Sequence, residues 1–167
     1  MDLLIAILLV IIAIGLGVLI WMYNKKTKTK PEILQPQASN SSFLMLQAYE
    51  RLITLSERIG FNKLTERLSS DILGANEQAN VFTEAIRNEF EYNLSQQIYV
   101  SDKAWQMVAD FKEQQIFIIG QLLNVLPKNS TGSDLIRAMI DFIHADEKAS
   151  LQSIVLETLR FEARQKI

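Results

Sequence analysis

The sequence predicts an all-α protein: one N-terminal transmembrane helix, a flexible tether, and a soluble helical bundle of four to five helices. Three observations lead to this fold class. An uncharged apolar run begins the chain, and a short basic segment containing Pro and Ser follows it. Beyond that segment, apolar residues recur at helical spacing, with no alternating stretch long enough for a strand. We expect an anchor over residues 1–23, a linker over 24–42 and the bundle over 43–167.

The predicted anchor runs from Leu3 to Tyr23, 21 residues without a charged side chain. A helix of that length rises about 31 Å, close to the thickness of the hydrocarbon core of a bilayer. Trp21 and Tyr23 fall at one end, where amphipathic rings favour the headgroup level. Asp2 precedes the run and no small-x-small cleavage site follows it, so the pattern differs from a cleaved signal peptide. The lipid bilayer is therefore the first predicted partner.

The charges that flank the anchor predict its orientation. The only charged side chain before the run is Asp2, whereas lysines crowd the other flank. By the positive-inside rule, the N-terminus lies outside and the C-terminal domain lies in the cytoplasm, at the cell inner membrane. The same lysines can contact anionic headgroups, for about 1 kcal/mol each, although setting the topology is the simpler role. These lysines are Lys25, Lys26, Lys28 and Lys30.

Apolar periodicity and capping residues divide the bundle into helices. Leu44 and Ile72 are expected to point inward, and Gly60 and Gly74 to close the helices that precede them. Ser101 is expected to cap the helix after it. The predicted helices are Phe43–Ile59, Asn62–Leu73, Asn76–Ile98, Asp102–Val125, and a last region over 134–165 that is either one helix or two.

Two further expectations concern the second half of the bundle. Ile116–Leu126 is apolar nearly all round, yet too short to span a bilayer, and so predicts a buried central helix. Ser133 is expected to cap the last helical region. Trp105 is expected to lie in the core, because large aromatic side chains are mostly buried.

Composition and motifs exclude several kinds of function. The net charge is −2 and the domain after the linker is acidic, which argues against nucleic acid as a partner. The chain has no cysteine, so no disulfide or thiolate metal site is expected. His144 is the only histidine and lacks the second histidine that a two-metal bundle site needs. No phosphate-binding loop or nucleophile motif is present. We therefore expect no catalytic residue, no metal ligand and no cofactor.

The densest polar and aromatic stretch, 88–101, holds the candidate partner surface. Steps of three and four residues would bring five side chains to one side of a helix, where tyrosines could anchor a protein partner. The simpler interpretation is the solvated face of a helix whose other side packs inward, and it is the favoured one. The five candidate residues are Glu89, Tyr92, Asn93, Gln96 and Tyr99.

Three segments carry a resemblance to a known kind of protein: Leu46–Leu52, Ser56–Ile59, and Glu89–Ser101 with Trp105. The chain resembles a family of uncharacterised bacterial single-span membrane proteins with a short cytoplasmic helical domain. The resemblance implies the architecture and no activity, cofactor or site.

The favoured hypothesis is a membrane-tethered interaction or scaffold module, without chemistry of its own, that holds a protein partner of unknown identity. The alternative is a structural homo-oligomer, because Ala13 and Gly17 form a small-xxx-small pair through which two spans can approach. An enzyme with a site that follows no motif is a third and weaker hypothesis.

Overall fold

The computed structural model describes residue 16 and residues 37–145 and 151–166. These residues form α-helices and one 3₁₀ helix, and no strand, which confirms the all-α prediction. The chain divides into two units, Met1–Ala38 and Ser39–Ile167. The helices are α2 (Gln37–Ile59), α3 (Phe61–Leu68), α4 (Ala75–Tyr92), η1 (Leu94–Ile98), α5 (Asp102–Val125), α6 (Gly132–Ala145) and α7 (Leu151–Arg164).

The predicted anchor, Leu3–Tyr23, and the lysines of its flank lie outside the described residues, apart from Leu16, which is helical. Within the described ranges, no helix combines the length and the apolar character that crossing a bilayer requires. Helix α2 begins at Gln37, inside the segment expected to be a linker.

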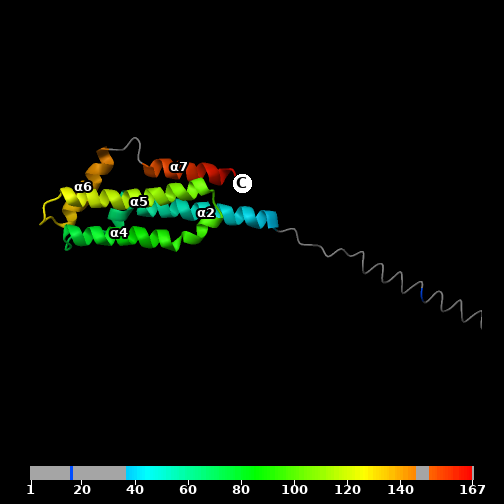
Figure 1. Cartoon of the computed structure of the whole chain (residues 1–167), viewed down its shortest axis with the longest axis horizontal. Helices are drawn as coiled ribbons and strands as arrows, with labels where there is room; N and C mark the ends of the chain where they lie inside the picture. The colour runs from blue at the N-terminus through cyan, green and yellow to red at the C-terminus, as the bar shows by residue number, and fades with distance from the viewer. Residues whose placement is uncertain (1–15, 17–36, 146–150, 167) are drawn as a thin grey trace, which may run out of the picture. The chain divides into compact units, whose positions relative to one another are not determined.

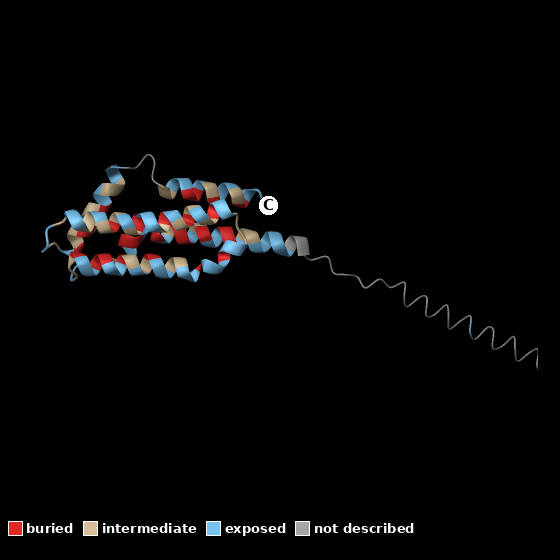
Figure 2. Ribbon diagram, in the orientation of Figure 1, coloured by how far each residue is buried: buried red, intermediate tan, exposed pale blue. Residues whose placement is uncertain are grey.

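In the second unit, α5 lies between α4 and α7, and α6 packs against α3, α4 and α5 (Figure 1). The helix faces that point toward one another carry the buried side chains (Figure 2). Steps of three and four residues place these side chains on one stripe of each helix, so a single core forms between the helices. Fully buried core members include Leu52, Leu55, Ile59, Phe82, Ile86, Val108, Phe111, Leu135, Met139 and Leu159.

The described part of the chain holds six α-helices where the sequence predicted four to five. The last region is two helices: α6 packs against α3, α4 and α5, and α7 packs along α5. The predicted helix Asn76–Ile98 is also divided: α4 ends at Tyr92, and the 3₁₀ helix η1 follows Asn93.

Two expected core residues are exposed. Helix α3 ends at Leu68, five residues before the predicted end, so Ile72 lies beyond it and is 92% exposed. Leu44 is 41% exposed near the start of α2. A periodic pattern predicts which face is apolar, but neighbouring elements decide how far along a helix that face is covered.

The prediction of a buried central helix over Ile116–Leu126 is wrong for most of that segment. Ile119 is buried, but Phe117 is 64% exposed and Val125 is 77% exposed. The other apolar residues of the segment are partly buried and pack against the core: Ile116, Ile118, Leu122, Leu123 and Leu126. This half of α5 therefore has a buried side and an exposed side, although most of its residues are apolar.

The ends of the helices confirm one predicted cap and correct two other expectations. Ser101 caps α5, since its Oγ accepts from the backbone N–H of Ala104 at 3.0 Å. Thr131, and not Ser133, caps α6 by exchanging hydrogen bonds with Asp134. These bonds hold the pKa of the Asp134 carboxyl below its ordinary value. Gly60 has an ordinary negative φ, and the side chain of Gln152 occupies the space that a Cβ at this position would need.

Candidate partner-binding surface

The structure does not present the five predicted surface residues as one exposed face. Tyr92 is 77% exposed on α4, whereas Asn93 and Gln96 are buried and Tyr99 is half-buried. The helix ends between them: Asn93 turns inward and donates from Nδ2 to the carbonyl of Glu89 at 2.8 Å. The change from α-helix to 3₁₀ helix breaks the three- and four-residue steps on which the predicted face depended.

Glu89 has a structural role at this surface. Its Oε1 accepts from Arg58 Nε of α2 at 2.7 Å and from Arg67 Nη1 of α3 at 3.3 Å, so one carboxylate links three helices. The hydrogen bond to Glu89 also raises the pKa of Arg58 above its ordinary value. Ion pairs this exposed contribute little net stability, and we regard the cluster as fixing the relative position of the helices.

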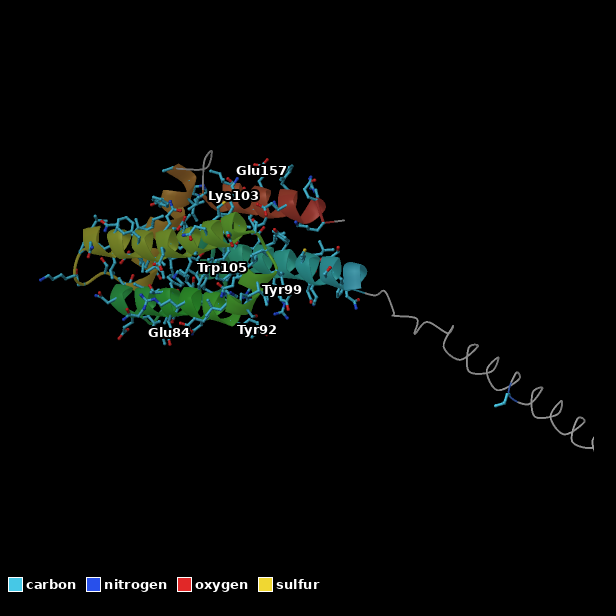
Figure 3. All side chains as sticks on the ribbon, turned by 45° about the vertical axis from the view of Figure 1, so that its right-hand side comes forward. Glu84, Tyr92, Tyr99, Lys103, Trp105 and Glu157 are labelled. Carbon is cyan, nitrogen blue, oxygen red and sulfur yellow. The ribbon has the colours of Figure 1, made fainter. Side chains whose placement is uncertain are left out.

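Tyr92 lies between two hollows in the surface, and its position at the outer side of α4 is visible in Figure 3. The smaller hollow, of about 280 Å³, lies over α3 and α4. The larger, of about 530 Å³, lies between α2 and α4, and we call it the Tyr92 groove. The Tyr92 groove is lined by Gln47, Glu50, Arg51, Thr54, Leu55, Arg58, Glu89, Tyr92 and Asn93.

Sequence reasoning found three of these lining residues, Glu89, Tyr92 and Asn93, and missed the contribution of α2. The α2 residues lie more than thirty positions earlier in the chain, and no local pattern links them to α4. The ion pair between Arg58 and Glu89 brings the two segments together. The signal in the sequence that could have pointed to α2 is its exposed charged residues, Glu50, Arg51 and Arg58.

Beneath this surface, α4 is fixed to α5 by aromatic packing. The rings of Phe90 and Trp105 lie 5.0 Å apart, and Lys112 Nζ lies 4.7 Å from the centre of the Phe90 ring. Trp105 is half-buried and packs against the core, as Figure 3 shows between α4 and α5. The contacts of Phe90 with α5 therefore fix the end of α4 that carries Tyr92.

A second polar cluster, which the sequence did not predict, joins α2 to α7. Tyr49 is fully buried, and its hydroxyl donates to Glu162 Oε2 at 2.7 Å while accepting from the Ser101 N–H at 3.2 Å. Ser101 Oγ donates to the same carboxylate oxygen at 2.6 Å. Burial is the first cause, and the bond to Glu162 the second, of a Tyr49 pKa above the ordinary 10.0. We call these three residues the Tyr49 cluster.

The Tyr49 cluster is occupied by its own hydrogen bonds. Over residues 37–145 and 151–166, no group of three His, Asp or Glu side chains could hold a metal ion. His144 and Asp141 are exposed near the end of α6, and the Asp146 that the sequence places beside them lies outside the described residues. The surface can bind through shape and charge.

In the described part of the chain, these features define an all-α protein with a surface groove beside an exposed tyrosine. The chain belongs to the family described as a family of unknown function (DUF7935), whose model matches residues 1–166. An uncharacterised family was the expectation from sequence. No curated protein and no solved structure matches the chain.

Proposed function

We propose that the chain is a membrane-tethered helical interaction module, with Leu3–Tyr23 as its anchor and no chemistry of its own. The tether is supported by sequence: an uncharged run long enough for a bilayer, with lysines on its C-terminal flank only. That asymmetry supports a helical unit at the cytoplasmic face of the inner membrane. The lysines are Lys25, Lys26, Lys28 and Lys30.

The observation that best supports the interaction role is the exposure of Tyr92. A tyrosine that is 77% exposed and flanked by hollows on both sides is a typical anchor for a protein partner. Arg51 lines the same groove and is exposed, and no described residue forms an ion pair with it. The partner that fits is a protein segment with an apolar side chain to cover Tyr92 and an acidic side chain to pair with Arg51.

Photo-crosslinking in membranes tests the proposal. A benzophenone amino acid at position 92 of the full-length chain should give one dominant adduct with a second protein. The same group at Gln106, which is exposed on α5 outside the groove, should give none. Arg51→Glu should lower the yield at position 92. Equal adducts from both positions, or none from position 92, would contradict the proposal.

The anchor is tested separately by fractionation. The full-length chain should remain with the membrane after washing with salt and carbonate, and a reporter fused to Ile167 should be active in the cytoplasm. Recovery in the soluble fraction would exclude the membrane tether. The interaction role would then be judged from the crosslinking result alone.

Structural self-association is the alternative function. Exposed apolar side chains on α5, among them Phe117 and Val125, are of the kind that a second copy would cover. An adduct from position 92 with twice the mass of the chain would favour this alternative, as would crosslinking from position 117.

A further inference from the structure

A cavity on another side of the helical unit has no role in the proposed interaction. It has a volume of about 240 Å³ and lies where α3, α5, α6 and α7 meet. Its residues do not overlap with those of the Tyr92 groove. Its apolar lining consists of three phenyl rings and three aliphatic side chains: Phe61, Phe111, Phe142, Ile118, Ile143 and Leu151.

The rings are fixed in position by the core. Phe61 and Phe111 are buried, and the rings of Phe61 and Phe142 meet edge to face with centres 6.2 Å apart. Among the described residues, none that lines the cavity carries a charge, so these residues offer no ion-pair partner to a phosphate, a carboxylate or an ammonium group. The polar part of its lining is supplied by side-chain amides, of Asn62, Gln114, Gln115 and Gln152.

One of these amides is incompletely satisfied. Gln115 is 6% exposed, and no hydrogen-bond donor within the described part of the chain reaches its Oε1. Buried polar atoms nearly always have a partner, because leaving one without costs about 1–3 kcal/mol. Gln78, which is fully buried, uses both ends of its amide. The unpaired carbonyl of Gln115 belongs to a residue that lines the cavity, where a bound molecule can supply the missing donor.

We infer that this cavity is a binding site for a small, uncharged aromatic molecule that donates one hydrogen bond to Gln115 Oε1. The phenyl walls select a planar apolar body, because ring faces and edges pack favourably against one another. The described lining residues are all uncharged, which favours a neutral ligand. The volume lies just below the usual range for drug-sized ligands, about 300–1,000 Å³, and so favours one or two rings.

Indole and 1-methylindole form a matched pair of probes, because they share the bicyclic ring and only indole has an N–H donor. We would titrate each into the isotope-labelled full-length chain, purified in one detergent, and follow the resonances of the cavity residues. Both probes should shift the signals of Phe111 and Ile118. Indole should bind about two- to tenfold more tightly, the ratio expected for one hydrogen bond.

Gln115→Met removes the acceptor while nearly preserving the shape of the side chain. In this variant the affinity for indole should fall to that for 1-methylindole, and the affinity for 1-methylindole should stay unchanged. Gln121→Met, on an exposed position of the same helix outside the cavity, is the matched control and should keep the preference.

Three results would overturn the inference. The first is no shift at the cavity residues with either probe, which would leave water as the partner of Gln115. The second is equal affinity of the two probes for the unmodified chain. The third is an indole preference that survives Gln115→Met. None of these outcomes depends on the Tyr92 groove.

Discussion

Gln78 and Gln115 are the same residue type in nearly the same degree of burial, yet the structure uses them in opposite ways. Gln78 is fully buried, and it donates from Nε2 to the Leu68 carbonyl at 2.9 Å and accepts from the Ser70 N–H at 3.1 Å. Gln115 has a carbonyl oxygen that no described donor reaches. The first amide completes the fold, and the second opens onto a cavity.

The difference shows that the hydrogen bonding of a buried polar group indicates whether the group serves the fold or a binding site. A fully satisfied group rigidifies the elements that it joins, and removing it leaves its backbone partners unpaired. An unsatisfied group destabilises the fold and persists only where something else uses it. The two glutamines should therefore respond with opposite signs to the same substitution.

Gln78→Met should have the largest effect, a loss of about 3 kcal/mol in the free energy of unfolding. The substitution keeps the shape but leaves the Leu68 carbonyl and the Ser70 N–H without partners where α3 ends, and each unsatisfied buried group costs about 1–3 kcal/mol. Chemical denaturation of the full-length chain measures the change. If Gln78→Met is as stable as the unmodified chain, the hydrogen bonds of Gln78 do not stabilise the fold, and the predicted difference between Gln78 and Gln115 is wrong.

Tyr49→Phe should lower the free energy of unfolding by about 2 kcal/mol. The variant keeps the buried ring and removes the hydroxyl that donates to Glu162 and accepts from Ser101, so both lose a partner. Tyr92→Phe is the matched control and should change stability by less than about 0.5 kcal/mol, because that hydroxyl belongs to an exposed side chain. Similar losses from both tyrosines would mean that the Tyr49 cluster does not stabilise the fold.

The same cluster predicts a dependence of stability on alkaline pH. Burial and Glu162 raise the pKa of Tyr49 in the folded chain above its ordinary value of 10.0, so folding favours the protonated phenol. The associated stabilisation is complete below the pKa of the unfolded chain and is lost as the pH rises through the folded pKa. Between pH 9 and 11, the unmodified chain should lose more stability than Tyr49→Phe does. Parallel curves would contradict the prediction.

Gln115→Met should raise the free energy of unfolding by about 1 kcal/mol. It replaces an unsatisfied amide with an apolar side chain of similar shape, and such replacements are neutral to stabilising. The measurement is the same denaturation experiment without added ligand. A loss of stability would show that Gln115 makes hydrogen bonds in solution and would weaken the case for a ligand.

Local signals in the sequence were sufficient for some features of the fold. Ser101 caps α5 as predicted, because a cap depends on a side chain and a backbone N–H only three residues apart. The all-α class followed from apolar spacing. The end of α3 was not predicted, and one of the contacts made there is distant in sequence: Gln78 donates to the Leu68 carbonyl from ten residues further on.

The sites depended still more on distant contacts. Tyr49 and Glu162 are 113 positions apart, and the cavity gathers residues from four helices. On the candidate surface, Tyr92 was predicted to be exposed and is, but the turn at Asn93 withdrew Asn93 and Gln96 into the interior. Periodicity assumes an uninterrupted helix, and it fails where the helix ends.

Ile72 offers the smallest and sharpest test of this limit. The periodicity of the sequence makes Ile72 the next apolar position of α3 and places it in the core. On that interpretation, Ile72→Ala should lower the free energy of unfolding by about 2–5 kcal/mol. The structure makes Ile72 92% exposed, beyond the end of the helix, and predicts a change of less than about 0.5 kcal/mol. Leu64→Ala, at a fully buried position of the same apolar stripe, supplies the full loss for comparison. If both substitutions destabilise the chain alike, Ile72 is a core residue and α3 continues past Leu68.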